Sequence, residues 1–530
     1  MKVHQSVLGK HNLALMLLHI IKYICWWQFK RDFMKAFKIF FFTTLLFWTF
    51  HFNSYGQKNE LFKIFPPSSP EQQGISSLVL DSMMLFIKNT NQNIHHLAII
   101  RNNQTVLDAD VYPYSSQYLH DLASVTKSFT SMLIGIGIDK EFIKDENEKV
   151  LKFFTEITNH NQLLDSLTIK DLITMTSGFA CGVSDGEKAL SDMRKTNHWV
   201  KFIFNLPITS KPGESFSYCS CNFYLLAEII YRTTKLTLHD FAKKYLFSPL
   251  QIIDTKWLTN YKGMNNGWGD LFLYPADMAK IGKLVLDKGK WQGKQIISEQ
   301  WIDKSLKTFS RLPYDKGYGY GWWTNDKAGY YEAAGRGRQT ISVIPSKNMI
   351  VTMLGGEFDA GTIGKYIFQS IQSDKALPEN KTSLSALTNT IKEIVSAPSL
   401  KFSSINNNII QKLNKKTIAF EKNIAEIDSL QFDFLSKEQG TVTFYKNKSK
   451  EKYPFVLSTN VYALGFDSTL QLPVALQAKF ENENEFVLHF NQLCRINNFY
   501  FHFTINENSI MTTMEEASNF IKTNIASSIK

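Results

Sequence analysis

The stretch "ASVTKSFTSMLIGIGI", residues 123–138, carries the clearest structural signal in the chain. Its apolar side chains recur at the spacing of one helix face: Val125, Phe129, Met132, Leu133 and Ile136. Ser124 and Lys127 lie one helical turn apart at the beginning of this run, so the lysine can reach the serine hydroxyl. A serine in the first turn also lies at the positive end of the helix dipole, which favours developing negative charge. The pattern predicts a buried helix, with a candidate nucleophile and a candidate activating lysine at its beginning.

The S-x-x-K spacing alone does not establish this chemistry. The same letters occur at Ser449–Lys452 and Ser527–Lys530, and an N-cap serine followed by a surface lysine would give the same pattern. A second segment adds support, because "KPGESFSYCSCNFYLLAEII" (211–230) places Tyr218 in a loop before an amphipathic helix. A tyrosine hydroxyl near Lys127 can carry a proton between nucleophile and leaving group. The alternative is that Tyr218 is a core aromatic residue.

A third segment, "YYEAAGRGRQTISVIPSKNMIVTML" (330–354), places Gly335 and Gly337 before a strand. Glycines allow a backbone to approach a ligand closely, and free N–H groups at a strand edge can hold an oxyanion. A β-turn without a ligand is the alternative.

In this order the three segments resemble the serine β-lactamase-like superfamily. That group includes class C β-lactamases, D-Ala-D-Ala carboxypeptidases, related esterases and 6-aminohexanoate-dimer hydrolases, and its motifs are S-x-x-K, Y-x-N or Y-x-S, and a K-T-G-like strand. The likeness extends over residues 66–375. It implies an α+β fold with a β-lactamase/transpeptidase-like antiparallel sheet and a helical subdomain. It also implies a small-molecule or peptide-like substrate, with neither a metal nor a cofactor.

The resemblance assigns a role to each matching residue. Ser124 would be the acylated nucleophile, Lys127 its activator and Tyr218 the proton shuttle. Substrate would be bound by Ser220, the third residue of Y-x-S, and at Gly335 and Arg336, with the backbone N–H groups of Ser124 and Arg336 forming an oxyanion hole.

Two departures from the family pattern concern the substrate. Ala333 stands where penicillin-recognising members have Lys or His, and Ser220 replaces Asn. Both favour an exported hydrolase of esters or short amides over a true β-lactamase or D-Ala-D-Ala carboxypeptidase. A catalytically inactive member that binds cell wall or glycan is the remaining alternative.

Five cysteines are present, and their spacing matches no zinc pattern. Relatives carry cysteines at places similar to Cys181 and Cys219, so the resemblance indicates a disulfide between these two. Cys221 competes with Cys219 for that pairing, and two buried free thiols are the alternative.

The N-terminal residues 1–56 read as an extension followed by a signal peptide. Residues 34–56, "MKAFKIFFFTTLLFWTFHFNSYG", combine a basic head, twelve uncharged residues and small residues suited to cleavage, with Met34 as a candidate start. Twelve residues are fewer than the roughly 20 that span a bilayer, so we expect an exported, periplasmic or secreted protein without stable membrane insertion. A membrane anchor built from residues 13–21 and 39–50 is the alternative.

The positive charge does not indicate a nucleic-acid partner. The net charge is +11, but residues 1–56 hold seven basic residues and one acid, so the rest carries 52 basic and 47 acidic residues. That mild excess argues against nucleic-acid binding.

Beyond residue 380 the composition changes. Residues 380–530 contain short aromatic and β-branched runs such as "TVTFY" and "FYFHFTI" at hairpin spacing, which predicts a β-rich accessory domain shaped as a sandwich or barrel.

Three other patterns are candidate sites. "GVSDG" (182–186) matches the G-x-S-x-G elbow of α/β-hydrolases but lacks a preceding buried strand. His95 and His96 lack metal-ligand companions, which favours a capping or surface role. The aromatic cluster at 318–323 is interpreted as a core strand.

Overall fold

The computed structural model describes residues 62, 64–183, 186–423, 426–446, 449–468, 470–506, 509–516, 518 and 521–529. The predicted signal peptide and the candidate start Met34 lie outside these residues. Two compact units are distinguished, Met1–Lys63 and Ile64–Lys530, and only the second is discussed below. Within the described residues no helix has the length and apolar character needed to cross a bilayer.

The centre of the fold is an antiparallel sheet of eight strands in the order β2-β1-β13-β12-β11-β10-β9-β8. Its first hairpin turns at Asn102 and Asn103, whose φ angles of 51° and 61° suit asparagine better than most residues. Strand β1 then pairs with β13, about 250 residues later in the chain, so segments from both ends of the predicted domain build one sheet. The strands are β1 (Ile94–Arg101), β2 (Gln104–Asp110), β8 (Ser310–Arg311), β9 (Gly317–Tyr318), β10 (Trp323–Asn325), β11 (Tyr330–Ala334), β12 (Thr340–Ile344) and β13 (Met349–Gly355).

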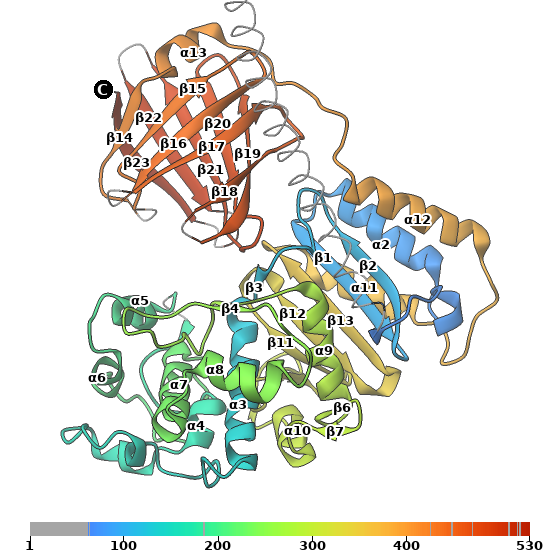
Figure 1. Cartoon of the computed structure of the whole chain (residues 1–530), viewed down its shortest axis with the longest axis vertical. Coiled ribbons are helices and arrows are strands. Elements are labelled where there is room, and N and C mark those ends of the chain that lie inside the picture. Colours follow the sequence, from blue (N-terminus) through green and yellow to red (C-terminus); the bar gives the residue numbers. More distant parts are fainter. Residues whose placement is uncertain are drawn as a thin grey trace, which may run out of the picture. The chain divides into compact units, whose positions relative to one another are not determined.

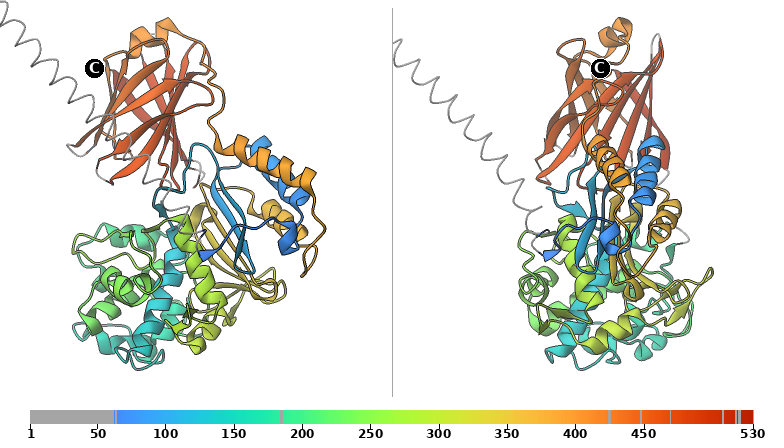
Figure 2. Two further views of the ribbon diagram at one scale, coloured as in Figure 1. Left: turned by 45° about the vertical axis from the view of Figure 1, so that its right-hand side comes forward. Right: turned by 90° about the vertical axis from the view of Figure 1, so that its right-hand side faces the viewer.

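Helices cover both faces of this sheet (Figure 1). One face packs against α2 (Ser77–Asn89), α11 (Ala360–Ser370) and α12 (Lys381–Val395), with which it shares a hydrophobic cluster. The other face contacts α9 (Pro275–Leu286) and the helical subdomain. Figure 2 shows the same layers from two further directions.

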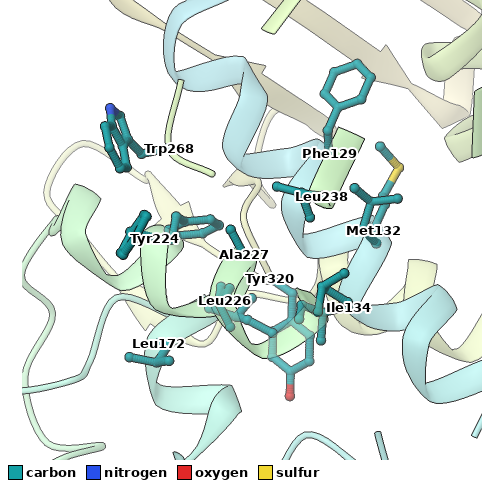
Figure 3. Close-up of a cluster of buried hydrophobic side chains, with 14 of the residues drawn as sticks. Phe129, Met132, Ile134, Leu172, Tyr224, Leu226, Ala227, Leu238, Trp268 and Tyr320 are labelled. Carbon is teal, nitrogen blue, oxygen red and sulfur yellow. The ribbon is translucent and has the colours of Figure 1, made fainter. Parts of the chain in front are cut away.

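The helical subdomain is built around α3 (Thr126–Asp139), which is buried from Thr126 to Gly137. Figure 3 shows Phe129, Met132 and Ile134 of α3 in one apolar cluster with Leu226 and Ala227 of α7. A helix enclosed on all sides can hold a polar side chain only where that side chain finds a specific partner. The other helices are α4 (Ile169–Ile173), α5 (Lys188–Arg194), α6 (Trp199–Phe204), α7 (Ser220–Thr234), α8 (Leu238–Ala242) and α10 (Glu299–Leu306).

Two small sheets complete this part of the chain. One is a three-stranded sheet in the order β3 (His120–Asp121), β5 (Leu271–Leu273) and β4 (Lys256–Trp257). Its strand β3 comes directly before the predicted nucleophile. The other is the hairpin of β6 (Lys290–Trp291) and β7 (Lys294–Gln295).

The C-terminal part is a closed β-barrel, which confirms the predicted β-rich domain. Ten strands follow one another in a single antiparallel order, and a parallel pairing of β17 with β19 closes the sheet. Its interior is packed with apolar side chains such as Phe432, Phe455, Phe486 and Phe503. The elements are α13 (Asn407–Leu413), β14 (Thr417–Phe420), β15 (Ser429–Phe434), β16 (Gln439–Lys446), β17 (Ser449–Leu457), β18 (Ala463–Asp467), β19 (Leu472–Phe480), β20 (Glu485–Asn491), β21 (Asn498–Ile505), β22 (Ile510–Glu516) and β23 (Ile521–Ile529).

The beginning of that domain differs from the expected position at residue 380. Residues 381–395 form α12, which buries Leu387 and Ile394 against the layer that contains α2. Thr390 Oγ1 also donates a hydrogen bond of 2.6 Å to Asp81 Oδ1 of α2. This helix therefore packs with the preceding domain, and the first barrel strand begins only at Thr417.

Candidate active site

Ser124 lies in a 3-10 turn, Ala123–Val125, that leads directly into α3. Lys127 Nζ donates hydrogen bonds to Ser124 Oγ at 2.8 Å and to the carbonyl oxygen of Trp268 at 3.0 Å. Lys127 is only 1% exposed, because α3 is enclosed by α7 and the loop that carries Trp268. Both acceptors are uncharged oxygens, so the hydroxyl of Ser124 is a principal polar contact of this buried amine.

Tyr218 lies next to the same lysine, in the loop that precedes α7. Lys127 Nζ is 4.9 Å from the centroid of the Tyr218 ring. That ring stacks on Trp323 with centroids 5.7 Å apart, and its edge contacts Tyr318. Tyr218 is thus held between the lysine and two aromatic residues of the sheet.

The end of β11 approaches the Ser124 turn closely. A Cβ atom added to Gly335 would lie 2.9 Å from Ser124 N and 2.8 Å from the carbonyl oxygen of Leu122. Gly335 has a φ of −139°, so glycine is needed here for close approach and not for its backbone conformation. Ala123, by contrast, has a φ of 47°, a strained conformation for alanine directly before the nucleophile.

Ser124, Tyr218 and Gly335 share one cavity of 390 Å³. It is lined by Ser124, Tyr218, Gly335 and Arg336 together with Val183, Glu187, Lys316, Trp323, Thr324, Asn325, Tyr330, Glu332, Ala334 and Arg338. A larger cavity of 800 Å³ in the helical subdomain is lined by Trp199, Tyr224 and Tyr261 and contains none of the predicted site residues. Chemistry, and not size, therefore identifies the candidate site.

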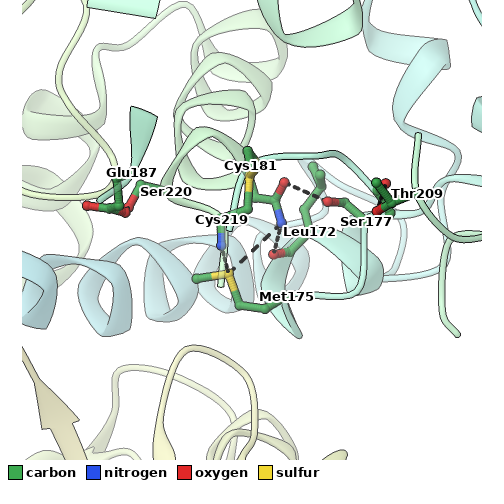
Figure 4. The surroundings of a disulfide bond; sticks show 10 residues. Leu172, Met175, Ser177, Cys181, Glu187, Thr209, Cys219 and Ser220 are labelled. Carbon is green, nitrogen blue, oxygen red and sulfur yellow. Dashed lines mark hydrogen bonds between the residues drawn. A yellow bond between two sulfur atoms is a disulfide. The ribbon is translucent and has the colours of Figure 1, made fainter. Parts of the chain in front are cut away.

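Ser220 occupies a different place from the one that the sequence suggests. Its side chain is buried and donates a hydrogen bond to Glu187, and it is Glu187 that lines the cavity (Figure 4). Ser220 therefore positions a carboxylate at the wall of the cavity.

Ala333 also points away from the cavity. It is fully buried in the core that the sheet shares with the helical subdomain, while Tyr330, Glu332 and Ala334 line the cavity from alternate positions of β11. Burial raises the pKa of Glu332. A hydrogen bond from Ser342 and the charges of Lys316 and Arg338 oppose this rise. Strand alternation could have pointed to Glu332, whereas Glu187, in a left-handed turn with a φ of 58°, has no recognisable sequence signal.

Cys181 and Cys219 are joined by a disulfide, with Cα atoms 5.2 Å apart (Figure 4). Cys219 follows Tyr218 and is the N-cap of α7, and its backbone N–H donates to the sulfur of Met175 at 3.3 Å. Cys221 and Cys494 are buried free thiols. Burial raises the pKa of Cys221 to about 12, which keeps this thiol protonated beside the disulfide.

Among the described residues, the cluster whose ligand atoms lie close enough to hold a metal ion is Cys181, Cys219 and Cys221. Two of its three sulfur atoms are used in the disulfide. This cluster therefore offers a metal ion one thiol in the oxidised chain.

The competing patterns of the sequence have different outcomes. The expectation of a surface or capping role for His95 and His96 is wrong, because both are buried; His95 Nδ1 lies 2.7 Å from His120 Nε2 and His96 Nδ1 2.9 Å from Asp110 Oδ1. Tyr318, Tyr320 and Trp322 are at most 1% exposed, which confirms the core interpretation for these three residues, whereas Trp323 is partly buried and lines the cavity. Ser184 and Asp185 of "GVSDG" lie outside the described residues.

Comparison with known proteins identifies the family to which the central part of the chain is matched. Residues 95–359, half of the chain, match the family model described as Beta-lactamase. The chain belongs to the Beta-lactamase family. The matched region contains α3, the helix of the S-x-x-K motif, and also the strand pair β12–β13.

The similar proteins are distant. Protein flp from Staphylococcus aureus (strain COL) is 29% identical over 229 residues, 39% of this chain and 46% of that protein, so the chain spans about half the length of these curated relatives. The 6-aminohexanoate-dimer hydrolase of Paenarthrobacter ureafaciens is 23% identical over 289 residues, 50% of this chain and 73% of the relative. A solved penicillin-binding protein homologue from Pyrococcus abyssi covers 85% of this chain and 99% of its own, at 16% identity and a TM-score of 0.45.

Proposed function

We propose that this protein is a serine hydrolase that forms an acyl-enzyme at Ser124 with esters or short amides. The observation that carries the proposal is the 2.8 Å hydrogen bond between Lys127 Nζ and Ser124 Oγ at the buried end of α3. A serine hydroxyl is a weak nucleophile without an adjacent base, and an amine at this distance can act as that base.

The reaction begins when Ser124 Oγ attacks the substrate carbonyl carbon. Lys127, in its amine form, takes the hydroxyl proton as the Oγ–C bond forms and the carbonyl electron pair moves to oxygen. The N–H groups of Ser124 and Arg336, on the two backbone segments that meet at Gly335, hold the resulting oxyanion. Such donors act most strongly when they are fixed before the reaction.

The tetrahedral intermediate then collapses. The C–O or C–N bond of the leaving group breaks, and Tyr218 passes a proton from Lys127 to the departing alcohol or amine. Water attacks the acyl-enzyme with the same groups in reverse order, and the carboxylic acid is released with Ser124 restored.

Two alanines of β11 and the aromatic part of the cavity lining support esters or short amides as substrates. Ala334 faces the cavity and offers neither a hydroxyl nor a cation to the carboxylate of a β-lactam. Ala333, on the buried side of β11, adds no charge. The aromatic rings of Tyr218, Trp323 and Tyr330 provide apolar contact area. These features favour esterase or amidase chemistry over hydrolysis of β-lactams.

We further infer that the protein is exported to the periplasm or the medium and acts there without a nucleic-acid partner. The support for export is the basic head and short apolar run of residues 34–56. Fractionation of cells that express the full chain, with detection of a shortened N-terminus in the exported fraction, tests this inference.

Covalent labelling tests the catalytic proposal. A fluorophosphonate probe should label the wild-type chain, and Ser124→Ala should abolish the label. Ser128→Ala is the matched control, because Ser128 lies on the same helix and donates to the carbonyl oxygen of Gly321 instead. A wild-type chain that is not labelled, or a Ser124→Ala variant that is, would overturn the proposal in favour of a protein that binds without catalysis.

A further inference from the structure

Loops of the C-terminal barrel contact the segments on both sides of the candidate oxyanion hole. The loop between β20 and β21 reaches β3, where Asp121 N donates to the carbonyl oxygen of Cys494 at 2.9 Å. Cys494 is buried there in a small apolar cluster with Phe272 and Leu472. The barrel is thus in contact with the strand that directly precedes the Ser124 turn.

On the Ser124 side the contact passes through a carboxylate. Asp121 Oδ1 accepts a hydrogen bond of 2.8 Å from Ala123 N, so Asp121 fixes the turn that presents Ser124. Arg495 of the barrel has its Nε atom 3.8 Å from Asp121 Oδ2 and its Nη2 atom 4.0 Å from Asp270 Oδ1. Burial raises the pKa of Asp121, and the charge of Arg495 opposes this and favours the ionised carboxylate.

This support matters because Ala123 has a strained backbone. A non-glycine residue with a φ of 47° persists only when its surroundings hold it. The hydrogen bond from Ala123 N to Asp121 is one such restraint, and Arg495 provides the charge that keeps its acceptor in place.

On the Arg336 side the barrel contacts the other donor segment. Arg336 Nη1 donates to Ser518 Oγ and lies 4.0 Å from Glu516 Oε2, while its Nη2 is 3.5 Å from Asn497 Oδ1. Glu516 is 3% exposed, and its Oε1 accepts hydrogen bonds from the backbone N–H and the hydroxyl of Ser518.

Apolar packing adds to these polar contacts. A methyl group of Ile496 lies 2.5 Å from the position that a Cβ atom on Gly337 would take. The turn that begins at Arg336 is therefore covered by barrel residues at its side chain and at its backbone.

We propose that the C-terminal barrel sets the geometry of the oxyanion hole, with Arg495 and Glu516 as the principal positioning residues. This inference rests on the proposed function, because it concerns the same two backbone N–H groups. Backbone donors cannot be adjusted by their own side chains, so their alignment depends on what holds the two turns. Loss of one oxyanion donor costs roughly 10²–10³-fold in kcat, and misalignment by a lost support costs part of that factor.

The test uses the full chain and a p-nitrophenyl ester as substrate. Arg495→Met and Glu516→Gln should each lower kcat by about 10- to 100-fold with KM changed less than threefold, because the interaction is made in the transition state. A boronic acid forms a covalent bond to Ser124 and occupies the oxyanion hole. Its affinity should fall in parallel with kcat, whereas the affinity for the product acid should not fall. Arg495→Lys should recover part of the lost kcat.

Two further variants separate positioning from folding. Ser518→Ala removes a hydroxyl that contacts Arg336 and Glu516 but leaves both charges in place, and it should give a smaller fall in kcat at an unchanged melting temperature. Glu485→Gln is the control, because Glu485 pairs with His502 in the same barrel and should leave kcat unchanged.

The outcomes distinguish this proposal from the one on which it rests. Activity that depends on Ser124 but stays within twofold of wild type in Arg495→Met, Glu516→Gln and Ser518→Ala would overturn the role of the barrel alone. Equal losses in kcat and in the folded fraction, with boronic acid affinity unchanged, would also overturn it. Activity that survives Ser124→Ala would overturn the proposed function itself.

Discussion

At the scale of single residues, the position of Lys127 explains why an S-x-x-K pattern is informative here and uninformative elsewhere in the chain. The Ser449–Lys452 pair lies in strand β17, where side chains three positions apart point to opposite faces. Ser124 and Lys127 instead lie on one side of a buried helix start and are hydrogen-bonded. The same letters thus acquire a chemical meaning only from the element that carries them.

This arrangement predicts that Ser124 and Lys127 act as one unit. Ser124→Ala and Lys127→Ala should each lower kcat/KM by at least about 10³-fold, and the double variant should be little worse than either single variant. Lys140→Met, at the exposed end of the same helix, should keep wild-type activity. Additive losses in the double variant, measured with a p-nitrophenyl ester, would contradict a shared role.

A second residue-scale prediction concerns the substrate. The wild-type chain should turn over a p-nitrophenyl ester much faster than nitrocefin, because β11 presents Ala334, which has neither a hydroxyl nor a charge, to the cavity. Ala334→Lys should narrow this gap by attracting the carboxylate of nitrocefin. Ala333→Lys should instead destabilise the protein, since Ala333 is fully buried and the charged amine of a lysine there would lose its contact with water. Comparable rates on the two substrates in the wild type would refute the inference.

At the scale of elements, periodic segments were predictable and their neighbours were not. The β1–β2 hairpin, the α3 stripe and the pair β12–β13 follow from local patterns of 2 and 3.6 residues. Helix α12 lies within residues 380–530, which the composition predicts to be β-rich, although its apolar face packs on the layer of α2. Glu187 was missed because a left-handed turn residue fits neither period.

The disulfide gives the prediction for this scale. It links the loop after α4 to the first residue before α7 and closes a loop of 38 residues, worth roughly 3–4 kcal/mol in the chain-entropy picture. Reduction should lower the melting temperature and also the activity, because Tyr218 adjoins Cys219. Cys181→Ser should show both losses without reductant and no further change with it. Alkylation of both cysteines in the unreduced wild type, detected by peptide mapping, would argue against the bridge.

At the scale of the whole molecule, the barrel could be predicted as a shape but not as a part of the site. Alternating aromatic residues in the tail indicate strands, and ten of them in one order close into a barrel. Contacts such as Arg495 with Asp121 and Ser518 with Arg336 join positions more than 180 residues apart in the chain. No local sequence pattern predicts such contacts. Long-range packing therefore carries the part of the site that the sequence did not reveal.

Buried histidines on both sides of the domain contact give the chain a predictable response to acid. Burial lowers the pKa of His120 in β3 and of His489 in β20 to about 4, from about 6.5 in an unfolded chain. Between these values the unfolded state binds protons that the folded state does not, so the free energy of unfolding falls as the pH falls from about 6.5 to about 4. Each group contributes about 2 kcal/mol of this loss by pH 5.

His120→Gln should therefore flatten the pH dependence of stability. Both ring nitrogens of His120 are in contact with polar groups, since Nε2 lies 2.7 Å from His95 Nδ1 and Nδ1 lies 2.8 Å from the carbonyl oxygen of Asp121. Urea unfolding at pH 7 and at pH 5 should show a smaller difference in the variant than in the wild type, by about 2 kcal/mol, whatever the variant loses at pH 7. An identical pH dependence in wild type and His120→Gln would mean that His120 titrates in the folded protein as it does in the unfolded chain.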